Sequence, residues 1–215
     1  MTRRLIALVA VGAVLAGALV FLGARHLFLA GSFCPLRFDS EKVPRLSGFG
    51  GSTAAYAGPG PHSLASYQAE SVTPVLFKMV AYKPSDEGLP ASWDAKYENG
   101  KPADVQLLLC AYDKQYDEDA DKVSQVRGQC DGYRYHDSNG VPGPERQIPV
   151  KAAPVTYLLY EAATKRLVTR FTLIAKDYTQ SVCPYIASAE DPEVWITPRP
   201  ADLAAALKPF VEASR

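Results

Sequence analysis

The chain has 215 residues, enough for one globular domain with a hydrophobic core, and roughly the first 30 residues differ in composition from the rest. Its 23 basic and 23 acidic side chains cancel, and no Lys/Arg cluster offers the basic surface that neutralises phosphates. We therefore exclude nucleic acid as a partner.

Residues 5–24 are an unbroken run of 20 apolar residues, which matches the thickness of a bilayer core. Arg3 and Arg4 precede the run, so the positive-inside tendency places residues 1–4 in the cytoplasm and the remainder outside. A cleaved signal peptide is the alternative, but a cut after Ala18 would leave an apolar new N-terminus. The sequence thus predicts a transmembrane signal-anchor helix and a single-pass protein of the cell membrane.

Residues 25–70 are predicted to be a stalk and linker, because the stretch 48–62 is dense in Gly, Pro and small residues. The segment GFGGST within it lacks the G-K-[ST] ending of a phosphate loop. His62, in the same stretch, is expected at the surface.

Residues 71–198 are predicted to form a β-rich extracytoplasmic domain. Alternating apolar and polar residues, rich in β-branched and aromatic types, indicate strands. The predicted strands are 74–82, 103–112 and 130–135, followed by a hairpin over 155–177 that turns around residues 163–165. The fold class expected is mainly β: a small antiparallel sandwich or curved sheet.

The segment 199–215 is predicted to be a short helix packed on this sheet. Pro200 suits the first helical position, and Leu203, Leu207 and Val211 recur at helical spacing. Pro209 should kink the helix or end it after Lys208.

Four cysteines follow the apolar run, and an even number of them suits disulfides in an oxidising compartment. They are Cys34, Cys110, Cys130 and Cys183. Three pairings are open. We favour Cys110 with Cys130, because each belongs to a β-like run and the loop between them is polar; Cys34 would then pair with Cys183. Zinc is the weaker use of these thiols, since there is no C-x-x-C pair.

The acidic loop between the two central cysteines is a candidate weak calcium site, carried by Asp117, Asp119 and Asp121. An EF-hand starting at Asp117 would need Gly at its sixth position and Glu at its twelfth, where this chain has Lys122 and Gly128. A solvated loop is therefore the preferred interpretation. We expect no metal and no cofactor.

No catalytic residue can be assigned. The chain has no G-x-S-x-G, H-E-x-x-H or S-x-x-K motif, and its three histidines are scattered. Tyrosines near the predicted strands, including Tyr112, Tyr133, Tyr157 and Tyr160, could form a contact surface, but we expect them in the core.

Three short patterns add a resemblance: L-L-x-C-x-Y ending at Tyr112, a degenerate Y-x-L-x-E-A motif from Tyr157, and Cys183-Pro184. With the basic N-terminus and the apolar run, they resemble uncharacterised membrane-anchored bacterial proteins, particularly of actinobacterial type. The resemblance implies an anchor and disulfides, and it implies no activity.

The function expected from the sequence is an extracytoplasmic binding or structural module of the cell envelope. Its partner would be an envelope protein or a wall polymer, and it would act by binding without catalysis. A carboxylate-based envelope hydrolase and a regulator of a membrane complex are the alternatives.

Overall fold

The computed structural model describes residues 33–34, 49, 51–73, 76–113, 123–136, 142–178, 182–183 and 193–214. In chain order the elements are β1 (Leu64–Thr73), β2 (Leu76–Tyr82), η1 (Pro84–Glu87), η2 (Ala91–Trp93), β3 (Lys96–Glu98), β4 (Lys101–Ala103), β5 (Leu107–Tyr112), β6 (Gln125–His136), β7 (Pro142–Ala152), β8 (Pro154–Glu161), β9 (Leu167–Ile174), β10 (Val194–Ile196) and α2 (Pro200–Val211). Here η marks a 3-10 helix.

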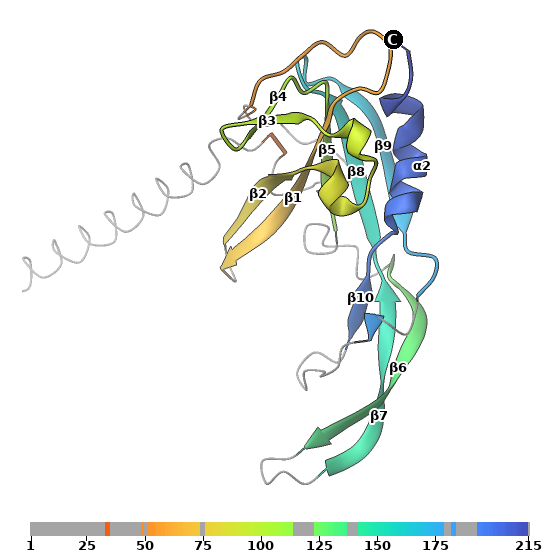
Figure 1. Ribbon diagram of the computed structural model, residues 1–215. Helices are drawn as coiled ribbons and strands as arrows, with labels where there is room; N and C mark the ends of the chain where they lie inside the picture. Colours follow the sequence, from red (N-terminus) through yellow and green to blue (C-terminus); the bar gives the residue numbers. More distant parts are fainter. Residues whose placement is uncertain are drawn as a thin grey trace, which may run out of the picture.

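The strands form a five-stranded sheet, a three-stranded sheet and the small β3–β4 hairpin (Figure 1). The predicted mainly β chain with a short C-terminal helix is confirmed. The predicted antiparallel sheet needs correction, because β1 pairs with β5, and β10 with β7, in parallel. A parallel pair needs a long crossover, and residues 74–106 provide it between β1 and β5.

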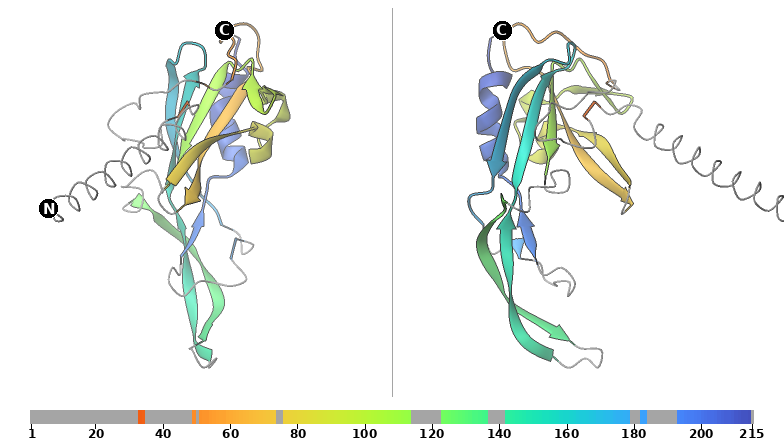
Figure 2. Two further views of the ribbon diagram at one scale, coloured as in Figure 1. Left: turned by 90° about the vertical axis from the view of Figure 1, so that its left-hand side faces the viewer. Right: turned by 180° about the vertical axis from the view of Figure 1, so that it is seen from behind.

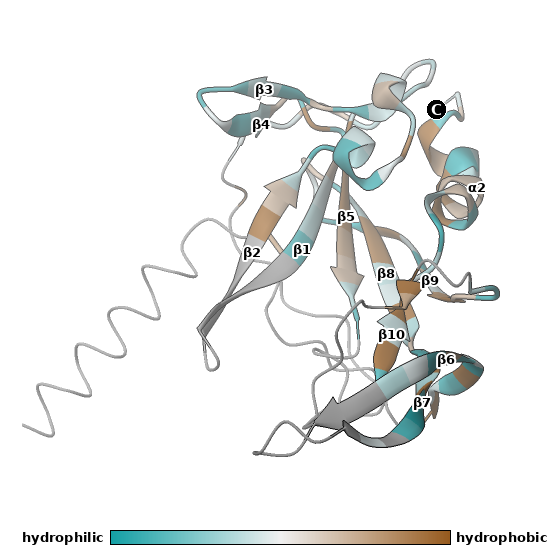
Figure 3. Ribbon diagram, turned by 60° about the horizontal axis from the view of Figure 1, so that its bottom comes forward, coloured by the Kyte–Doolittle hydropathy of each residue, from teal (hydrophilic) through white to brown (hydrophobic). Residues whose placement is uncertain are grey.

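The body of the molecule is the five-stranded sheet, in the order β2-β1-β5-β8-β9. Its central strand, β5, is buried on both faces: Leu107 and Leu109 belong to one core cluster, and Leu108 and Cys110 to the other. A strand covered on both faces has no polar side, which explains its continuous apolar sequence. Figure 3 shows hydrophobic residues along β5 and β8 and hydrophilic ones on the outlying β3–β4 hairpin.

One face of this sheet is covered by α2 together with η1 and η2 (Figure 1). Leu203, Leu207 and Val211 recur every four residues, so all three lie on the buried stripe of the helix. Each buried leucine contributes about 1.5–3 kcal/mol. The helix continues past Lys208 to Val211 with Pro209 inside it, so the predicted ending at Lys208 is wrong.

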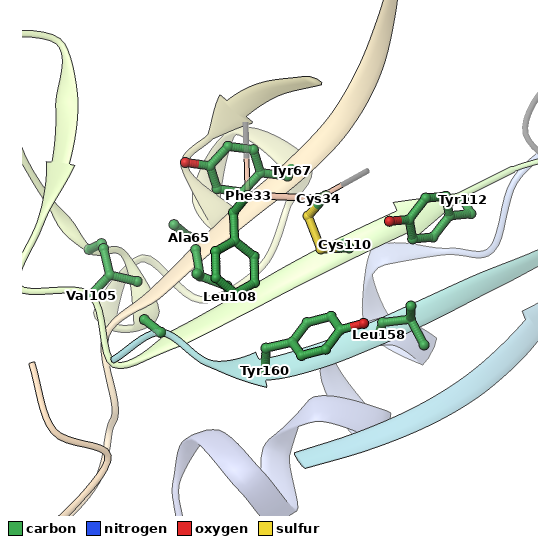
Figure 4. Close-up of a cluster of buried hydrophobic side chains, with 12 residues drawn as sticks. Phe33, Cys34, Ala65, Tyr67, Val105, Leu108, Cys110, Tyr112, Leu158 and Tyr160 are labelled. Atoms are coloured by element: carbon green, nitrogen blue, oxygen red, sulfur yellow. A yellow bond between two sulfur atoms is a disulfide. The ribbon is translucent and has the colours of Figure 1, made fainter. Parts of the chain in front are cut away.

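The opposite face is covered by residues from near the N-terminus (Figure 4). Phe33 and Cys34 are fully buried, and the ring of Phe33 lies edge-on to Phe49 and Tyr160 at centroid distances of 6.3 and 5.7 Å. Residues 33–34 are therefore part of the core, although the sequence predicted a stalk here.

Residues 51–63 also belong to the fold and not to a linker. Thr53 bridges to Val105, and β1 starts at Leu64. The predicted linker over 25–70 is thus wrong for residues 51–70. Gly60 allows close contact with the end of α2, since a Cβ at this position would lie 2.8 Å from backbone atoms of Val211 and Glu212.

His62 is fully buried, so its predicted surface position is wrong. Its backbone N–H donates to the Val211 carbonyl at 2.7 Å, and its ring Nε2 donates to the Ala213 carbonyl at 2.9 Å. The Tyr56 hydroxyl donates to the Phe210 carbonyl at 2.8 Å. The last carbonyls of a helix have no partner within the helix, and here the Tyr56 hydroxyl and the His62 backbone N–H supply donors to those of Phe210 and Val211.

The three-stranded sheet, in the order β10-β7-β6, extends beyond the body (Figures 1 and 2). Only Ala153, which is buried, separates β7 from β8. Strand β7 of this sheet therefore runs directly into β8, which lies inside the five-stranded sheet of the body.

No helix within the described residues is long and apolar enough to span a membrane. The predicted anchor, residues 5–24, lies outside them.

Candidate functional site: the β6–β7 arm

We call β6, β7 and β10 the arm, and its best-defined feature is a disulfide between Cys130 of β6 and Cys183. The second disulfide joins Cys34 to Cys110 in the body. Two disulfides were predicted and are confirmed, and they fit an oxidising extracytoplasmic environment.

The favoured pairing of Cys110 with Cys130, and of Cys34 with Cys183, is wrong. It assumed that the strands carrying Cys110 and Cys130 are hairpin neighbours. In the structure, β5 pairs with β1 and β8, whereas β6 pairs with β7 in a different sheet. The two cysteines therefore belong to separate core clusters and have different partners.

The arm has a small core of its own on one face, built around the disulfide. Its buried members are Cys130, Ile148, Val150 and Ala152 of β6 and β7, Ile196 of β10, and Ala175, which follows β9. This cluster fixes the base of the arm. Further out, the register shifts again between Cys130 and Tyr133 and between Arg134 and His136, and Gly132 has a φ of 87°.

Tyr178 packs against β6 at Gly128, which has no side chain to oppose it. A Cβ on Gly128 would lie 2.0 Å from the Tyr178 ring. The Tyr178 hydroxyl also donates to the carbonyl of Gln129 at 2.9 Å. Glycine is thus required here so that the Tyr178 ring can approach closely. The Tyr178 hydroxyl in turn occupies a backbone acceptor of β6, an edge strand.

A β-bulge turns Val126 out of the arm's core. Val126 pairs with Lys151 and Gly128 with Val150, so β6 advances two residues where β7 advances one. Directly paired residues share a face of a sheet. Val126 therefore lies on the face of Lys151, opposite the buried Val150, and 62% of it is exposed.

The same face continues across the sheet to Trp195, which pairs with Lys151. The Lys151 ammonium lies 5.5 Å from the Trp195 ring centroid and forms an ion pair with Glu193. Val126, Lys151 and Trp195 thus form a cross-strand row on the face away from the arm's core. We call it the arm row.

A polar site in the body lies at Glu87 of η1. Its Oε1 accepts hydrogen bonds from Ser66 Oγ at 3.1 Å and Gln68 Nε2 at 2.5 Å. Burial raises the pKa of the Glu87 carboxyl; the two hydrogen bonds oppose this rise and nearby Asp86 adds to it. The site joins η1 to β1.

Asp94, seven residues after Glu87, has a structural role. Asp94 accepts hydrogen bonds from the backbone N–H and the hydroxyl of Ser85, at 2.9 and 2.5 Å, and so joins η1 to the residue after η2. Within the described part of the chain, no group of three or more His, Cys, Asp or Glu side chains could hold a metal ion. The predicted calcium-loop residues Asp117, Asp119 and Asp121 lie outside that part.

Tyrosines of the central strands are in the core, as predicted: Tyr112, Tyr157 and Tyr160 are each at most 6% exposed. Burial raises the pKa of the Tyr160 hydroxyl to about 12. Tyr133, on the arm, is only partly buried.

Sequence reasoning missed both the arm and its outward row. Strand alternation through residues 124–130 places Val126 and Cys130 on the same face, and only an inserted residue separates them. Arg127 followed by Gly128 was the signal for such an insertion, because glycine inside a strand often marks a bulge or a close approach.

No protein-family model, no curated protein and no solved structure matches this chain. The geometry of the described residues is therefore the basis for a functional proposal.

Substituting Gly128 by alanine should destabilise the protein by about 1–3 kcal/mol, the usual cost of overpacking, because the new methyl group meets the Tyr178 ring. The measurement is the free energy of urea unfolding, combined with amide hydrogen exchange of β6. In a Tyr178→Ala background the same substitution should cost far less. Equal costs in both backgrounds would show that Tyr178 is not what requires glycine.

Substituting Glu87 by glutamine should stabilise the protein near pH 7. Because the folded-state pKa is raised, the contribution of Glu87 is most favourable below its unfolded pKa, about 4.3, and is lost as the pH rises through the folded value. Glutamine keeps an oxygen acceptor without the buried charge. The gain should fade towards about pH 4 in urea unfolding, and Glu98→Gln, at an exposed carboxylate, should show no such trend. A loss of stability at neutral pH would contradict the assignment.

Proposed function

We propose that this chain is a membrane-anchored, extracytoplasmic binding module of the cell envelope, and that the arm is its contact element. The two disulfides support the compartment, because such bonds persist outside the cytoplasm. The apolar run at 5–24, preceded by Arg3 and Arg4, supports the anchor and the orientation.

The buried position of Phe33 limits how far the body can stand from the membrane. Nine peptide units link residue 24, the end of the proposed span, to Phe33, and a fully extended chain covers at most about 3.3–3.6 Å per residue. The body is therefore held within about 30 Å of the bilayer surface. A partner farther away would have to be reached by an element that projects from the body.

The arm provides this element, and its shape is the observation that carries the proposal. β7 is joined to β8 through one buried residue, so the arm leaves the body in a fixed direction (Figure 2). β10 pairs only with Val150, Lys151 and Ala152 at the base of β7, so the outer part of the arm is a two-stranded ribbon, which adds little stability of its own in water. The disulfide and the small core at the base of the arm stabilise this projection. The core of the body does not depend on it.

We expect the full-length protein extracted from native membranes to keep its complete mass and to be alkylated only after reduction. An uncleaved anchor explains the first result, and two disulfides explain the second. The measurement is intact mass with and without reduction before alkylation. A mass lacking the N-terminus would exclude the anchor, and freely alkylated thiols would exclude the oxidising compartment.

A photo-cross-linking residue, p-benzoylphenylalanine, at Gln147 on β7 should form adducts with an envelope component in native membranes. The same residue at Glu98 on β3 is the matched control, since both positions are exposed strand residues. Adducts at position 147 should exceed those at position 98 by about tenfold or more, as expected for a contact worth at least about 1.4 kcal/mol. Equal yields at the two positions would contradict a binding role for the arm.

A further inference from the structure

We infer that His62 closes a proton-dependent latch, which holds the stretch before β1 to the end of α2 only while both nitrogens of its ring carry a proton. The latch consists of the His62 ring, the side chain of Gln106 and the backbone carbonyl of Ala213. It lies in the body and not in the arm, so it goes beyond the proposed binding function. Only its exposure to the pH outside the cytoplasm rests on the proposed compartment.

Both ring nitrogens of His62 face an oxygen atom. Nε2 lies 2.9 Å from the carbonyl oxygen of Ala213, which can only accept a hydrogen bond, and Nδ1 lies 3.2 Å from Oε1 of Gln106. A neutral imidazole has one donor and one acceptor nitrogen, whereas the imidazolium has two donors. The protonation of the ring therefore depends on which way the amide of Gln106 points.

Three further contacts fix the amide of Gln106. Its Oε1 accepts a hydrogen bond from the backbone N–H of Ser63 at 3.1 Å, and its Nε2 donates to the carbonyls of Ala55 and Ala57 at 2.8 and 3.4 Å. Turning the amide over would set its NH2 group against the Ser63 N–H and its oxygen against two carbonyls. The oxygen therefore faces Nδ1 of His62, and only the imidazolium satisfies both ring contacts.

Either neutral form of the ring breaks one side of the latch. Without a proton on Nε2, the ring nitrogen and the Ala213 carbonyl are two acceptors facing each other; without a proton on Nδ1, the same holds for Gln106 Oε1. His62 is fully buried, so bulk water cannot supply the missing donor while the latch is closed. Because the closed form binds the additional proton, its stability is greatest at low pH and is lost as the pH rises.

The position of the ring also suits a positive charge. The ring donates to a carbonyl just beyond the C-terminal end of α2, where the helix dipole attracts a cation. The ring of Tyr56 packs against it at a centroid distance of 4.6 Å, and the Tyr56 hydroxyl donates to the Phe210 carbonyl. The same end of the helix thus binds both aromatic side chains of the stretch before β1.

The charged side chains on the elements around the latch are paired with each other or exposed. Four of them form two ion pairs, which are Glu212 with Lys208 at the end of α2 and Glu161 with Arg166 at the β8–β9 turn. Asp104 is exposed, and its backbone carbonyl accepts the hydroxyl of Ser63. Within the described residues, the His62 ring hydrogen-bonds only with Gln106 and Ala213, so its own protonation decides whether the latch is closed.

Opening of the latch loosens the contact between two distant parts of the chain. The backbone N–H of His62 donates to the Val211 carbonyl at 2.7 Å, and this bond closes only when the stretch before β1 lies on the end of α2. Its amide is therefore a direct reporter of closure.

The first measurement is the protonation of the ring in the full-length chain, labelled with nitrogen-15 at histidine and held in detergent micelles. At pH 5, the NMR signals of both ring nitrogens of His62 should have the shifts of an imidazolium. Their loss in His62→Gln assigns them, because the other histidines are unchanged in that variant.

The second measurement is amide hydrogen exchange of His62 from pH 5 to pH 8, the range in which histidine changes its charge. After correction for the intrinsic exchange rate, protection should fall at least about tenfold, as expected when a buried donor is lost. The amide of Leu109, in the central strand β5, is the control and should keep its protection. In His62→Gln, protection at position 62 should not vary with pH.

A His62 ring that carries a single proton in the closed protein at pH 5 would overturn the inference. So would a corrected protection of its amide that does not change with pH. The spectrum of the unmodified chain decides this even if His62→Gln does not fold. The cross-links at Gln147 judge the proposed binding function separately, because they do not involve the latch.

Discussion

Burial of β5 on both faces is the constraint on which the rest of the structure depends. A strand with no solvent face needs two covers, and this chain takes them from its two ends: Phe33 and Cys34 on one side, α2 on the other. The Pro/Gly-rich stretch before β1 then has to close over the end of α2, where the Tyr56 hydroxyl and the His62 backbone N–H donate to the carbonyls of Phe210 and Val211. Sequence regions of unlike composition are thus parts of one core.

The arm follows from the same strand arrangement. Because β8 lies next to β5 and continues into β7, the hairpin partner of β7 has to lie outside the five-stranded sheet. With only one core-facing side available there, a single inserted residue is enough to expose Val126. The register also shifts within the body, between Leu159 and Tyr160 where β8 pairs with β9. On the arm, the inserted residue turns a side chain into solvent at little cost in stability. Bulges commonly re-aim side chains in this way beside functional sites.

Local pattern was sufficient for much of the fold. The hairpin of β8 and β9, the strand at β2 and the stripe of Leu203, Leu207 and Val211 all follow from spacing along the chain. Long-range choices did not follow. The parallel pairing of β1 with β5, the burial of His62 and the partner of Cys110 depend on which segments meet in space, and a polar loop between two strands does not make them neighbours. The arm row was hidden for a related reason, since alternation gives the wrong face after a bulge.

The disulfide pairing has a consequence for how the protein is made. Cys34 is bonded to Cys110 and Cys130 to Cys183, so each bridge joins one cysteine to the next along the chain, and the two loops do not overlap. If the chain crosses the membrane in sequence order from residue 25 onward, its thiols emerge one at a time. An oxidant that links each emerging thiol to the free one before it forms both native bonds directly. The order of the cysteines thus makes assembly independent of any later reshuffling enzyme, whereas either of the other two pairings would require the first thiol to wait.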